Sequence, residues 1–334
     1  MRAAVHHRRG EAAEVLEVID LPDPDPAGGE VRVRVLASGV NPSDVKSRMG
    51  KSSGQSGSGE PLPFDHQIPH QDGSGIVDAV GAGVDGSRVG EAVWLYNAAH
   101  ERATGTAAEL VCLPEHLAVP LPDGIPMGQA AGLGIPYVTA HRCLLADGEL
   151  TDATVLVTGG AGAVGNAAIQ LARYHGARVI ATTSTEEKAD LARAAGAEAT
   201  IDYRAADVTA RLEAAAPAGI DRVIDVSMMT NLPTYVDLLN PHAVAVGYAE
   251  IPGATGPEWP PLMSLRVKNL TLRFVRAYGL TAAMQDAAKQ DITRALEAGA
   301  LHPLPEHDFP LERIIEAHQA VEQGVTGKVI VNLP

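Results

Sequence analysis

The 334-residue sequence predicts an α/β protein built from a β-rich domain and a doubly wound parallel sheet. Two observations lead to this prediction. Short apolar runs separated by Gly, Pro and Asp turns fill the first third of the chain. Further along, apolar strands alternate with helical patterns, and a glycine-rich turn follows the first of those strands. The length agrees, since about 150 residues is a typical domain size and the chain has room for roughly two.

The first third is expected to fold as a compact barrel or sandwich. Apolar and polar residues alternate over Val31–Leu36, which is the period of a half-buried strand. Gly75–Gly81 and Ala92–Leu95 are further short runs bounded by turn residues. Gly50–Gly59 is rich in Gly and Ser, and is expected to be a solvated loop or a mobile lid.

The rest of the chain predicts alternating strands and helices. Val155–Thr158 is a short continuous apolar run, as expected for a strand that a parallel sheet buries on both faces. A helical pattern follows from Val164 to Ala172 and ends at Gly176. The further predicted elements are the strands Arg178–Thr182, Ala199–Asp202, Val223–Val226, Ala243–Val246, Leu270–Val275 and Lys328–Val331, and the helices Thr185–Ala195 and 311–324.

Composition narrows the partners and the location that we expect. The chain has 26 Lys and Arg against 41 Asp and Glu, a net charge of −15, so we expect no nucleic-acid partner and no anionic membrane partner. No apolar run approaches the ~20 residues of a membrane helix. The first residues lack the apolar core of a secretory signal, so a cytoplasmic protein is expected. The two cysteines, Cys112 and Cys143, provide neither a disulfide framework nor a cysteine-ligated zinc.

The strongest motif is the G-x-G-x-x-G string from Gly160 to Gly165, which also contains Gly162, Ala163 and Val164. It follows a buried strand and begins a helix, which is the context that a dinucleotide site requires. Its first glycine makes the tight turn, its second lets the backbone approach a pyrophosphate, and its third lets helix and strand pack closely. The helix N-terminus then offers N–H groups to the phosphates. The alternative is a glycine-rich turn that binds nothing.

The end of the next strand favours NADP over NAD. An NAD site usually has an acid there for the ribose 2′-hydroxyl, but this strand ends in hydroxyl residues up to Ser184. Lys188 can supply a positive charge to a 2′-phosphate, although it could instead be a solvated helix residue. Glu186 and Glu187 are expected to point outward from the first helical turn.

Two further stretches, Ala37–Asp44 and Gly132–Ala140, complete a pattern with the glycine motif. In order and spacing the three resemble the zinc-free branch of the medium-chain dehydrogenase/reductase superfamily, and within it the quinone oxidoreductases related to zeta-crystallin. The resemblance covers essentially the whole chain. It includes Gly219–Asp221, Lys268–Phe274 and Thr326–Lys328.

The resemblance implies the domain organisation. A GroES-like β-barrel is expected over residues 1–127, completed by 281–334, with a Rossmann NADP-binding domain over 128–280. It also implies an active cleft between the two domains, NADPH as the cofactor, and a homodimer in which the strand near 270–275 extends the sheet across subunits. Such pairing is physically reasonable, because a sheet edge offers unpaired backbone groups.

Zinc is not expected. Zinc-containing members of the superfamily have Cys where this chain has Asn41, and Gly-His-Glu where it has His70-Gln71-Asp72. Without three protein ligands a catalytic zinc cannot be held. His66 and His70 are four residues apart, but the surrounding prolines and glycines argue against a helix that would aim both at one metal ion.

The resemblance also assigns cofactor contacts. Asn41 and Thr139 are expected beside the nicotinamide, where an amide and a hydroxyl can hold the carboxamide; otherwise Asn41 is a turn residue and Thr139 a helix hydroxyl. Tyr203 is expected by the adenosine and its 2′-phosphate, or else is a plain aromatic at a strand end. Gly247, Tyr248, Phe274 and Val275 complete the expected cofactor contacts.

Lys46 departs from the family pattern. Several quinone reductases of this branch have Tyr at this position, where it can stack on a flat substrate or donate a proton. Lys46 could bind an anionic substrate group, donate a proton, or point to solvent. Ser43 matches a proton-relaying hydroxyl of zinc-dependent relatives, but without zinc it is expected to be a turn residue.

The function that these expectations favour is hydride transfer from NADPH to a quinone. The alternative substrate is a conjugated enone or enoyl compound, because hydride addition again leaves an enolate-type anion to be protonated. The proton could come from solvent, from Lys46 or from a cleft hydroxyl. An alternative of another class is a non-catalytic NADPH-binding protein. NAD-dependent alcohol oxidation is disfavoured by the absent zinc ligands and the absent acid.

Overall fold

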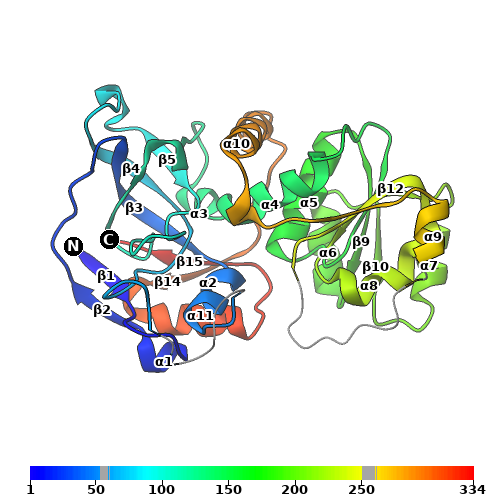
Figure 1. The fold of residues 1–334 in the computed structure, drawn as a ribbon, viewed down its shortest axis with the longest axis horizontal. Coiled ribbons are helices and arrows are strands. Elements are labelled where there is room, and N and C mark those ends of the chain that lie inside the picture. Colours follow the sequence, from blue (N-terminus) through cyan, green and yellow to red (C-terminus); the bar gives the residue numbers. More distant parts are fainter. Residues whose placement is uncertain (53–58, 60, 250–259, 261) are drawn as a thin grey trace. The chain divides into compact units, whose positions relative to one another are not determined.

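The computed structural model describes residues 1–52, 59, 61–249, 260 and 262–334 and divides the chain into two compact units (Figure 1). The first unit comprises Met1–Ile135 and Pro303–Pro334, and the second comprises Pro136–His302. The boundaries expected from the sequence, after residues 127 and 280, fall earlier in the chain than these. Most of the Gly50–Gly59 segment, for which a loop or lid is predicted, lies outside the described residues.

The first unit contains a seven-stranded sheet with a GroES-like fold. The strand order is β14-β15-β3-β4-β5-β7, and β6 pairs with β3. The alternation predicted for Val31–Leu36 is confirmed, because Val31, Val33 and Val35 are fully buried in β3. The strands are β3 (Glu30–Val40), β4 (Asp72–Val80), β5 (Ala92–Leu95), β6 (Leu110–Pro114), β7 (Ala118–Pro120), β14 (Glu306–Pro310) and β15 (Lys328–Asn332); β1 (Arg2–Val5) and β2 (Glu17–Asp20) form a separate pair.

The C-terminal segment belongs to this first unit. β15 pairs antiparallel with β3 and parallel with β14, so residues from the two ends of the sequence share one sheet. The predicted C-terminal helix is present as α11 (Ile314–Glu322), after a 3₁₀ turn at Leu311–Arg313. The other helices here are α1 (Ala12–Val15), α2 (Pro42–Arg48) and α3 (Met127–Ala131).

The second unit contains a six-stranded parallel sheet of the Rossmann type. The strand order is β10-β9-β8-β11-β12-β13. From β8 the chain first adds strands on one side and then, from β11, on the other side. The carboxyl ends of β8 and β11 at this switch point are the expected ligand position. The strands are β8 (Thr154–Val157), β9 (Arg178–Thr183), β10 (Ala199–Asp202), β11 (Ile220–Asp225), β12 (Leu239–Gly247) and β13 (Thr271–Phe274). The helices are α5 (Ala163–Tyr174), α6 (Glu186–Ala194), α7 (Val208–Ala215), α8 (Met228–Tyr235), α9 (Leu262–Val267) and α10 (Ala282–Glu297), while α4 (Gly134–Leu145) begins at the boundary of the units.

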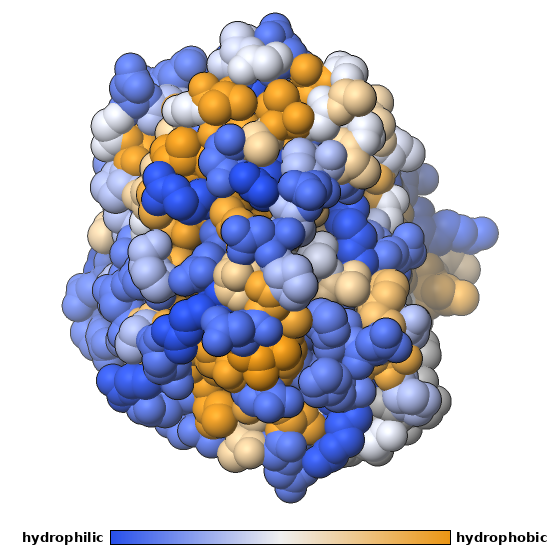
Figure 2. Space-filling view, turned by 90° about the vertical axis from the view of Figure 1, so that its left-hand side faces the viewer, coloured by the Kyte–Doolittle hydropathy of each residue, from blue (hydrophilic) through white to orange (hydrophobic). Residues whose placement is uncertain are grey.

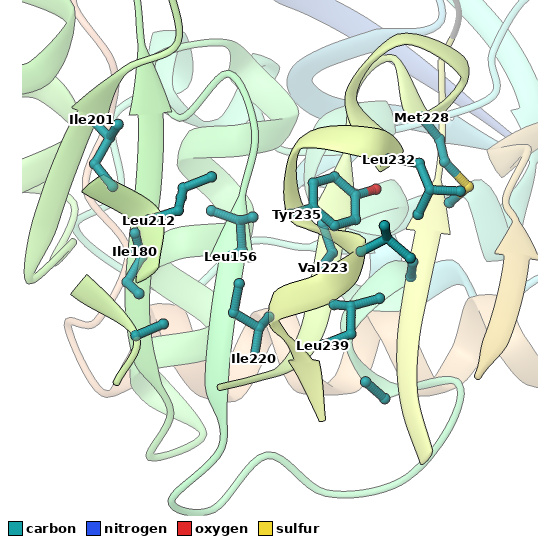
Figure 3. Close-up of a cluster of buried hydrophobic side chains, with 14 of the residues drawn as sticks. Leu156, Ile180, Ile201, Leu212, Ile220, Val223, Met228, Leu232, Tyr235 and Leu239 are labelled. Carbon is teal, nitrogen blue, oxygen red and sulfur yellow. The ribbon is translucent and has the colours of Figure 1, made fainter. Parts of the chain in front are cut away.

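Apolar side chains from the strands and helices of the second unit form its core. Leu156, Ile180 and Val223 come from three different strands and are fully buried. Figure 3 shows them in one cluster with Leu232 and Tyr235 of α8. Burying the strands from both sides explains why their sequences are continuously apolar rather than alternating.

The surface drawn in Figure 2 is mixed in polarity. Hydrophilic side chains predominate on this face and surround separate patches of hydrophobic ones. Within the described part of the chain, no helix combines the length and the hydropathy that a membrane crossing requires.

Candidate functional site

The glycine-rich turn begins directly after β8 and is anchored to the neighbouring strand β9. Gly159 has a φ of 69°, a left-handed conformation that favours glycine. The N–H of Gly160 donates to the carbonyl of Thr182 at 2.9 Å, and the N–H of Gly159 donates to the hydroxyl of Thr182 at 3.3 Å. The turn is therefore held in place before helix α5 begins at Ala163.

The glycines of this turn differ in what makes them necessary. A Cβ at Gly160 would lie 2.8 Å from the Cβ of Ala181, and one at Gly165 would lie 2.3 Å from the carbonyl oxygen of Gly159, so the packing of the protein itself excludes both. A Cβ at Gly162 would meet no protein atom closer than 3.4 Å. Gly162 also has ordinary extended backbone angles. Space is therefore left beside Gly162, next to the first N–H groups of α5, and this cradle fits the pyrophosphate of a dinucleotide.

Ser184 and Tyr203 follow the ends of adjacent parallel strands. Ser184 comes after β9 and Tyr203 after β10, and the N–H of Tyr203 donates to the carbonyl of Thr183 at 3.1 Å. Tyr203 is 53% exposed. Lys188 is half-buried in the first turns of α6, which starts two residues after Ser184. Ser184, Lys188 and Tyr203, which are predicted to contact the adenosine end of the cofactor, thus all follow the carboxyl ends of β9 and β10.

Two acids near this edge are bound by arginines. Asp202, the last residue of β10, accepts hydrogen bonds at 3.0 Å from the backbone N–H of Arg204 and twice from its side chain, and these bonds lower the pKa of Asp202. Glu186 pairs with Arg193 on the exposed surface of α6, as expected for an acid that points outward. These arginines offset the negative charge of the two acids near Ser184 and Lys188.

Gly247 and Phe274 end the neighbouring parallel strands β12 and β13, and Tyr248 and Val275 follow them. The N–H of Val275 donates to the carbonyl of Gly247 at 2.9 Å, and the N–H of Tyr248 donates to the carbonyl of Asp225 at 3.1 Å. Tyr248 is half-buried, Val275 is buried, and Phe274 is 65% exposed. These residues lie at the same carboxyl edge of the sheet as the glycine turn.

In the first unit, the structure surrounds Asn41 with charged partners that the sequence did not predict. Asn41 precedes helix α2, and its backbone N–H donates to the carboxyl group of Asp44 at 2.8 Å. Its side-chain Nδ2 donates to Oδ2 of Asp72 at 2.7 Å. Its Oδ1 accepts a hydrogen bond from Nζ of Lys328, also at 2.7 Å. All four residues are buried.

The charges of this buried group influence one another. Burial raises the pKa of Asp72 to about 6, opposed by the ammonium of Lys328 and the hydrogen bond from Asn41. Burial and the charge of Asp72 raise the pKa of Asp44 to about 7. Burial lowers the pKa of Lys328, and the two carboxyl groups oppose that effect. Nζ of Lys328 lies 3.9 Å from Oδ2 of Asp72, so the ammonium compensates the buried carboxylate.

A chain of buried hydrogen bonds ends on the backbone carbonyl of Asp72. The hydroxyl of Thr106 donates to this carbonyl at 2.5 Å, because a carbonyl oxygen can only accept. The proton of Thr106 is thereby used, so the Ser38 hydroxyl must donate to Thr106 Oγ1, 2.7 Å away. Ser38 Oγ then accepts from Nδ1 of His70 at 2.8 Å. His70 is consequently the tautomer with its proton on Nδ1.

The chain continues through a second histidine. Nε2 of His70 faces Nε2 of His318 at 2.9 Å, so His318 donates and His70 accepts. The guanidinium of Arg48, which has only donors, lies 3.3 Å from Nδ1 of His318. Arg48 also donates to the carbonyl of Gly10 and to the carboxylate of Glu322. Each histidine therefore has one donating and one accepting nitrogen, which requires both rings to be neutral.

His66 and His70, the two histidines that lie four residues apart in the sequence, have different partners. Both ring nitrogens of His70 are engaged in hydrogen bonds, whereas His66 contacts the ring of His7 instead. Across the ranges that the structure describes, no group of three His, Cys, Asp or Glu side chains is arranged to hold a metal ion. The donor set around Asn41, an amide between a carboxylate and an ammonium, does not fit zinc, because the ammonium lies where a cation would have to bind.

The two remaining predicted site residues lie in different units. Lys46 is half-buried in α2, five residues after Asn41. Thr139 is buried in α4, within the second unit.

The sequence contained signals for some of the residues that were missed. His318 stands on the apolar face of the predicted C-terminal helix, where a polar side chain needs a buried partner. Lys328 directly precedes the apolar run 329–331, so it begins a buried strand. No signal in the sequence linked either residue to Asn41 or His70, which lie 287 and 248 residues away.

Comparisons with known proteins agree with both units. Residues 27–123 match the family described as alcohol dehydrogenase GroES-like domain, and residues 163–300 match the family described as zinc-binding dehydrogenase. The chain is 30% identical over 322 residues to a quinone oxidoreductase of Sus scrofa, covering 94% of this chain and 92% of that protein. It is also 30% identical over 312 residues to a chloroplastic NADPH-dependent alkenal/one oxidoreductase of Arabidopsis thaliana, covering 90% and 72%. A solved NAD-dependent alcohol dehydrogenase superimposes with a TM-score of 0.85 at 30% identity, covering 100% of both chains.

Proposed function

We propose that this chain, which belongs to the quinone oxidoreductase family of the medium-chain dehydrogenase/reductase superfamily, is an NADPH-dependent, zinc-independent reductase of quinones. Family membership makes it an oxidoreductase that uses a nicotinamide cofactor. The main support for the proposal is the cradle at Gly162. Protein packing does not require a glycine at this position, and a pyrophosphate would fill the space beside it.

The preference for NADPH is proposed from the residues that follow β9 and β10. Ser184 can donate a hydrogen bond to a 2′-phosphate, Lys188 can supply a positive charge, and the ring of Tyr203 is exposed beside them. One relative is NADPH-dependent by its name, whereas one structural neighbour is NAD-dependent by its name. The preference for NADPH is therefore inferred from Ser184, Lys188 and Tyr203.

The residues of this chain would orient the reactants and stabilise charge. The cofactor supplies the hydride when it is bound. Asn41 and Thr139 are the proposed contacts of the nicotinamide carboxamide, and Lys46 is the proposed contact of the acceptor. Reduction of a quinone or enone develops negative charge on an oxygen, which a positioned N–H or ammonium stabilises. No metal is needed for this chemistry, in keeping with the ammonium of Lys328 beside Asn41.

A conjugated enone or alkenal is the second candidate acceptor, because the Arabidopsis thaliana relative is named for that activity and is also 30% identical to this chain. The test is oxidation of NADPH and of NADH over a panel of ortho- and para-quinones and linear enones. Turnover of quinones with NADPH preferred supports the main proposal. Turnover of enones alone would replace it with the second candidate, and binding without any turnover would contradict both.

Lys188→Ala should separate the two cofactors. We expect KM for NADPH to rise about 10- to 100-fold, since a charge-assisted hydrogen bond to phosphate is worth roughly 1.5–3 kcal/mol. KM for NADH should change by less than about twofold, since NADH lacks the 2′-phosphate. Steady-state kinetics with both cofactors measure this, with Lys289→Ala on α10 as the control. An equal loss with NADH and NADPH would remove Lys188 from the phosphate site.

A homodimer is also proposed, through the edge strand β13. Because the N–H of Val275 points to β12, the alternate N–H groups of Leu272 and Phe274 point away from the sheet. The adjacent helix α9 exposes Leu262, Met263 and Val267. Sedimentation equilibrium should give about twice the 34.7 kDa of the chain; the mass of a monomer would contradict pairing through this edge.

A further inference from the structure

The side-chain amide of Asn41 can adopt only one orientation. A carboxamide can be flipped by 180° without changing its shape, so its partners must decide which end is oxygen. Nζ of Lys328 can only donate, and it lies 2.7 Å from one end of the amide. The carboxylate of Asp72 accepts at the other end, also at 2.7 Å. Flipping the amide would set donor against donor at Lys328 and acceptor against acceptor at Asp72.

The two partners are themselves fixed. The second oxygen of Asp72 accepts the backbone N–H of Ile135 at 2.9 Å. A Cβ at Gly134 would lie 2.2 Å from that same oxygen, so glycine is required for this approach. A Cβ at Gly39 would lie 2.1 Å from the carbonyl of Ala131 and 3.0 Å from Cε of Lys328. Two glycines outside the dinucleotide motif thus make room for the carboxylate and for the lysine stem.

The backbone that carries Asp72 is held as well. Its carbonyl accepts the Thr106 hydroxyl at the end of the hydrogen-bond chain through Ser38 and His70. Lys328, at the start of β15, is held by the pairing of that strand with β3. The orientation of Asn41 therefore depends on segments that lie far apart in the sequence.

One N–H of Asn41 is left over. Nδ2 carries two protons, and among the described residues only the one donated to Asp72 has an acceptor. The ammonium at Oδ1 withdraws electron density from the amide, and the carboxylate at the first N–H acts in the opposite sense. Asn41 consequently offers an N–H in a fixed direction, which suits a carbonyl oxygen.

We propose that Asp72 and Lys328 are positioning residues that hold Asn41 so that its second N–H donates to a carbonyl oxygen of the bound reactants. This inference rests on the proposed function for the identity of that oxygen, which is either the nicotinamide carboxamide or the carbonyl of the acceptor. The orientation of the amide itself does not depend on the function.

A double-mutant cycle between Asn41 and Lys328 tests the positioning role. Lys328→Met keeps the aliphatic stem and removes the donor, and should lower kcat/KM at least about 10-fold. In the Asn41→Ala background the same change should have an effect below about twofold, because Lys328 then has no amide to orient. A loss of merely structural origin would be the same in both backgrounds, and that result would overturn the proposal. Lys268→Met, which removes an ammonium bound to backbone carbonyls in the second unit, is the matched control and should leave kcat/KM unchanged.

The kinetic parameters that change identify the oxygen. If the nicotinamide carboxamide is the acceptor of the N–H, Lys328→Met weakens the binding of NADPH measured by its fluorescence. If the carbonyl of the substrate is the acceptor, kcat falls while the Kd of NADPH is unchanged.

A spectroscopic experiment tests the orientation even if the protein reduces none of the acceptors. In protein labelled with ¹⁵N at asparagine, the Asn41 side-chain signals are identified by their loss in Asn41→Ala. Both Lys328→Met and Asp72→Asn should shift these signals, and Lys268→Met should not. Unshifted signals in Lys328→Met would overturn the assigned hydrogen bond, independently of any result on activity.

Discussion

Gly162→Val is expected to weaken binding of NADPH by about 100-fold or more, roughly 3 kcal/mol, while leaving the stability of the protein nearly unchanged. The isopropyl group would fill the cradle beside the first turn of α5, where no protein atom lies within 3.4 Å of the added Cβ. Its backbone angles suit any residue, so no strain is introduced. Cofactor fluorescence measures the Kd, and thermal unfolding measures the stability.

Gly165→Ala is the matched comparison within the same motif. Its Cβ would lie 2.3 Å from the carbonyl oxygen of Gly159, so the backbone must move and the variant should lose about 1–3 kcal/mol of stability. The two glycines thus separate a role in binding from a role in folding. Tight NADPH binding by Gly162→Val would show that the pyrophosphate does not occupy this turn.

Arg48→Met is expected to have the largest effect on stability. The Arg48 side chain is fully buried, and it donates to Nδ1 of His318, to the carbonyl of Gly10 and to Glu322. Removing one partner of a buried ion pair leaves the others unsatisfied and typically costs about 3–5 kcal/mol. Urea unfolding at neutral pH measures this loss. Arg9→Met, an exchange of a neighbouring arginine outside the hydrogen-bond chain, is the control.

The loss caused by Arg48→Met should shrink as the pH falls. Burial lowers the pKa of His70 to about 3, and burial together with His70 and Arg48 lowers the pKa of His318 well below its ordinary value. The unfolded chain takes up these protons near pH 6.5 while the native wild type does not, so each histidine costs wild-type stability up to about 1.4 kcal/mol per pH unit below 6.5. Without Arg48, His318 can be protonated on Nδ1 and can face Glu322. A difference between variant and wild type that stays constant or widens from pH 7.5 to 5.5 would contradict the tautomers assigned to the pair.

Most of the fold followed from local patterns. The alternation over Val31–Leu36 and the continuous apolar runs of the parallel strands match the observed β3 and the six-stranded sheet, and β10 has the bounds expected for Ala199–Asp202. These signals are local because hydrophobic periodicity and glycine stops act within a few residues. The β12 strand is longer than predicted because it begins with Leu239, Asn240 and Pro241, which no apolar pattern marks as strand.

The site was only partly predictable, for a physical reason. The glycine turn and the residues after β9 could be predicted because they belong to a motif whose functional residues lie close together in the sequence. The partners of Asn41 and the histidine pair are joined only by tertiary folding, so no spacing encodes them. The sequence offered two signs of buried polar contacts. One was Lys328, a charged residue at the start of an apolar strand, and the other was His318, a histidine on an apolar helix face.

We propose that this protein holds its acceptor, a quinone or conjugated carbonyl, where it would receive a hydride directly from bound NADPH. Single-turnover oxidation of NADPH carrying deuterium at C4, prepared as each of the two epimers, tests this most directly. Because the protein fixes which face of the ring is exposed, one epimer should react measurably more slowly than unlabelled NADPH and the other at nearly the unlabelled rate. Equal rates for both epimers in a step limited by chemistry, or no oxidation with any acceptor in the panel, would contradict direct hydride transfer from NADPH.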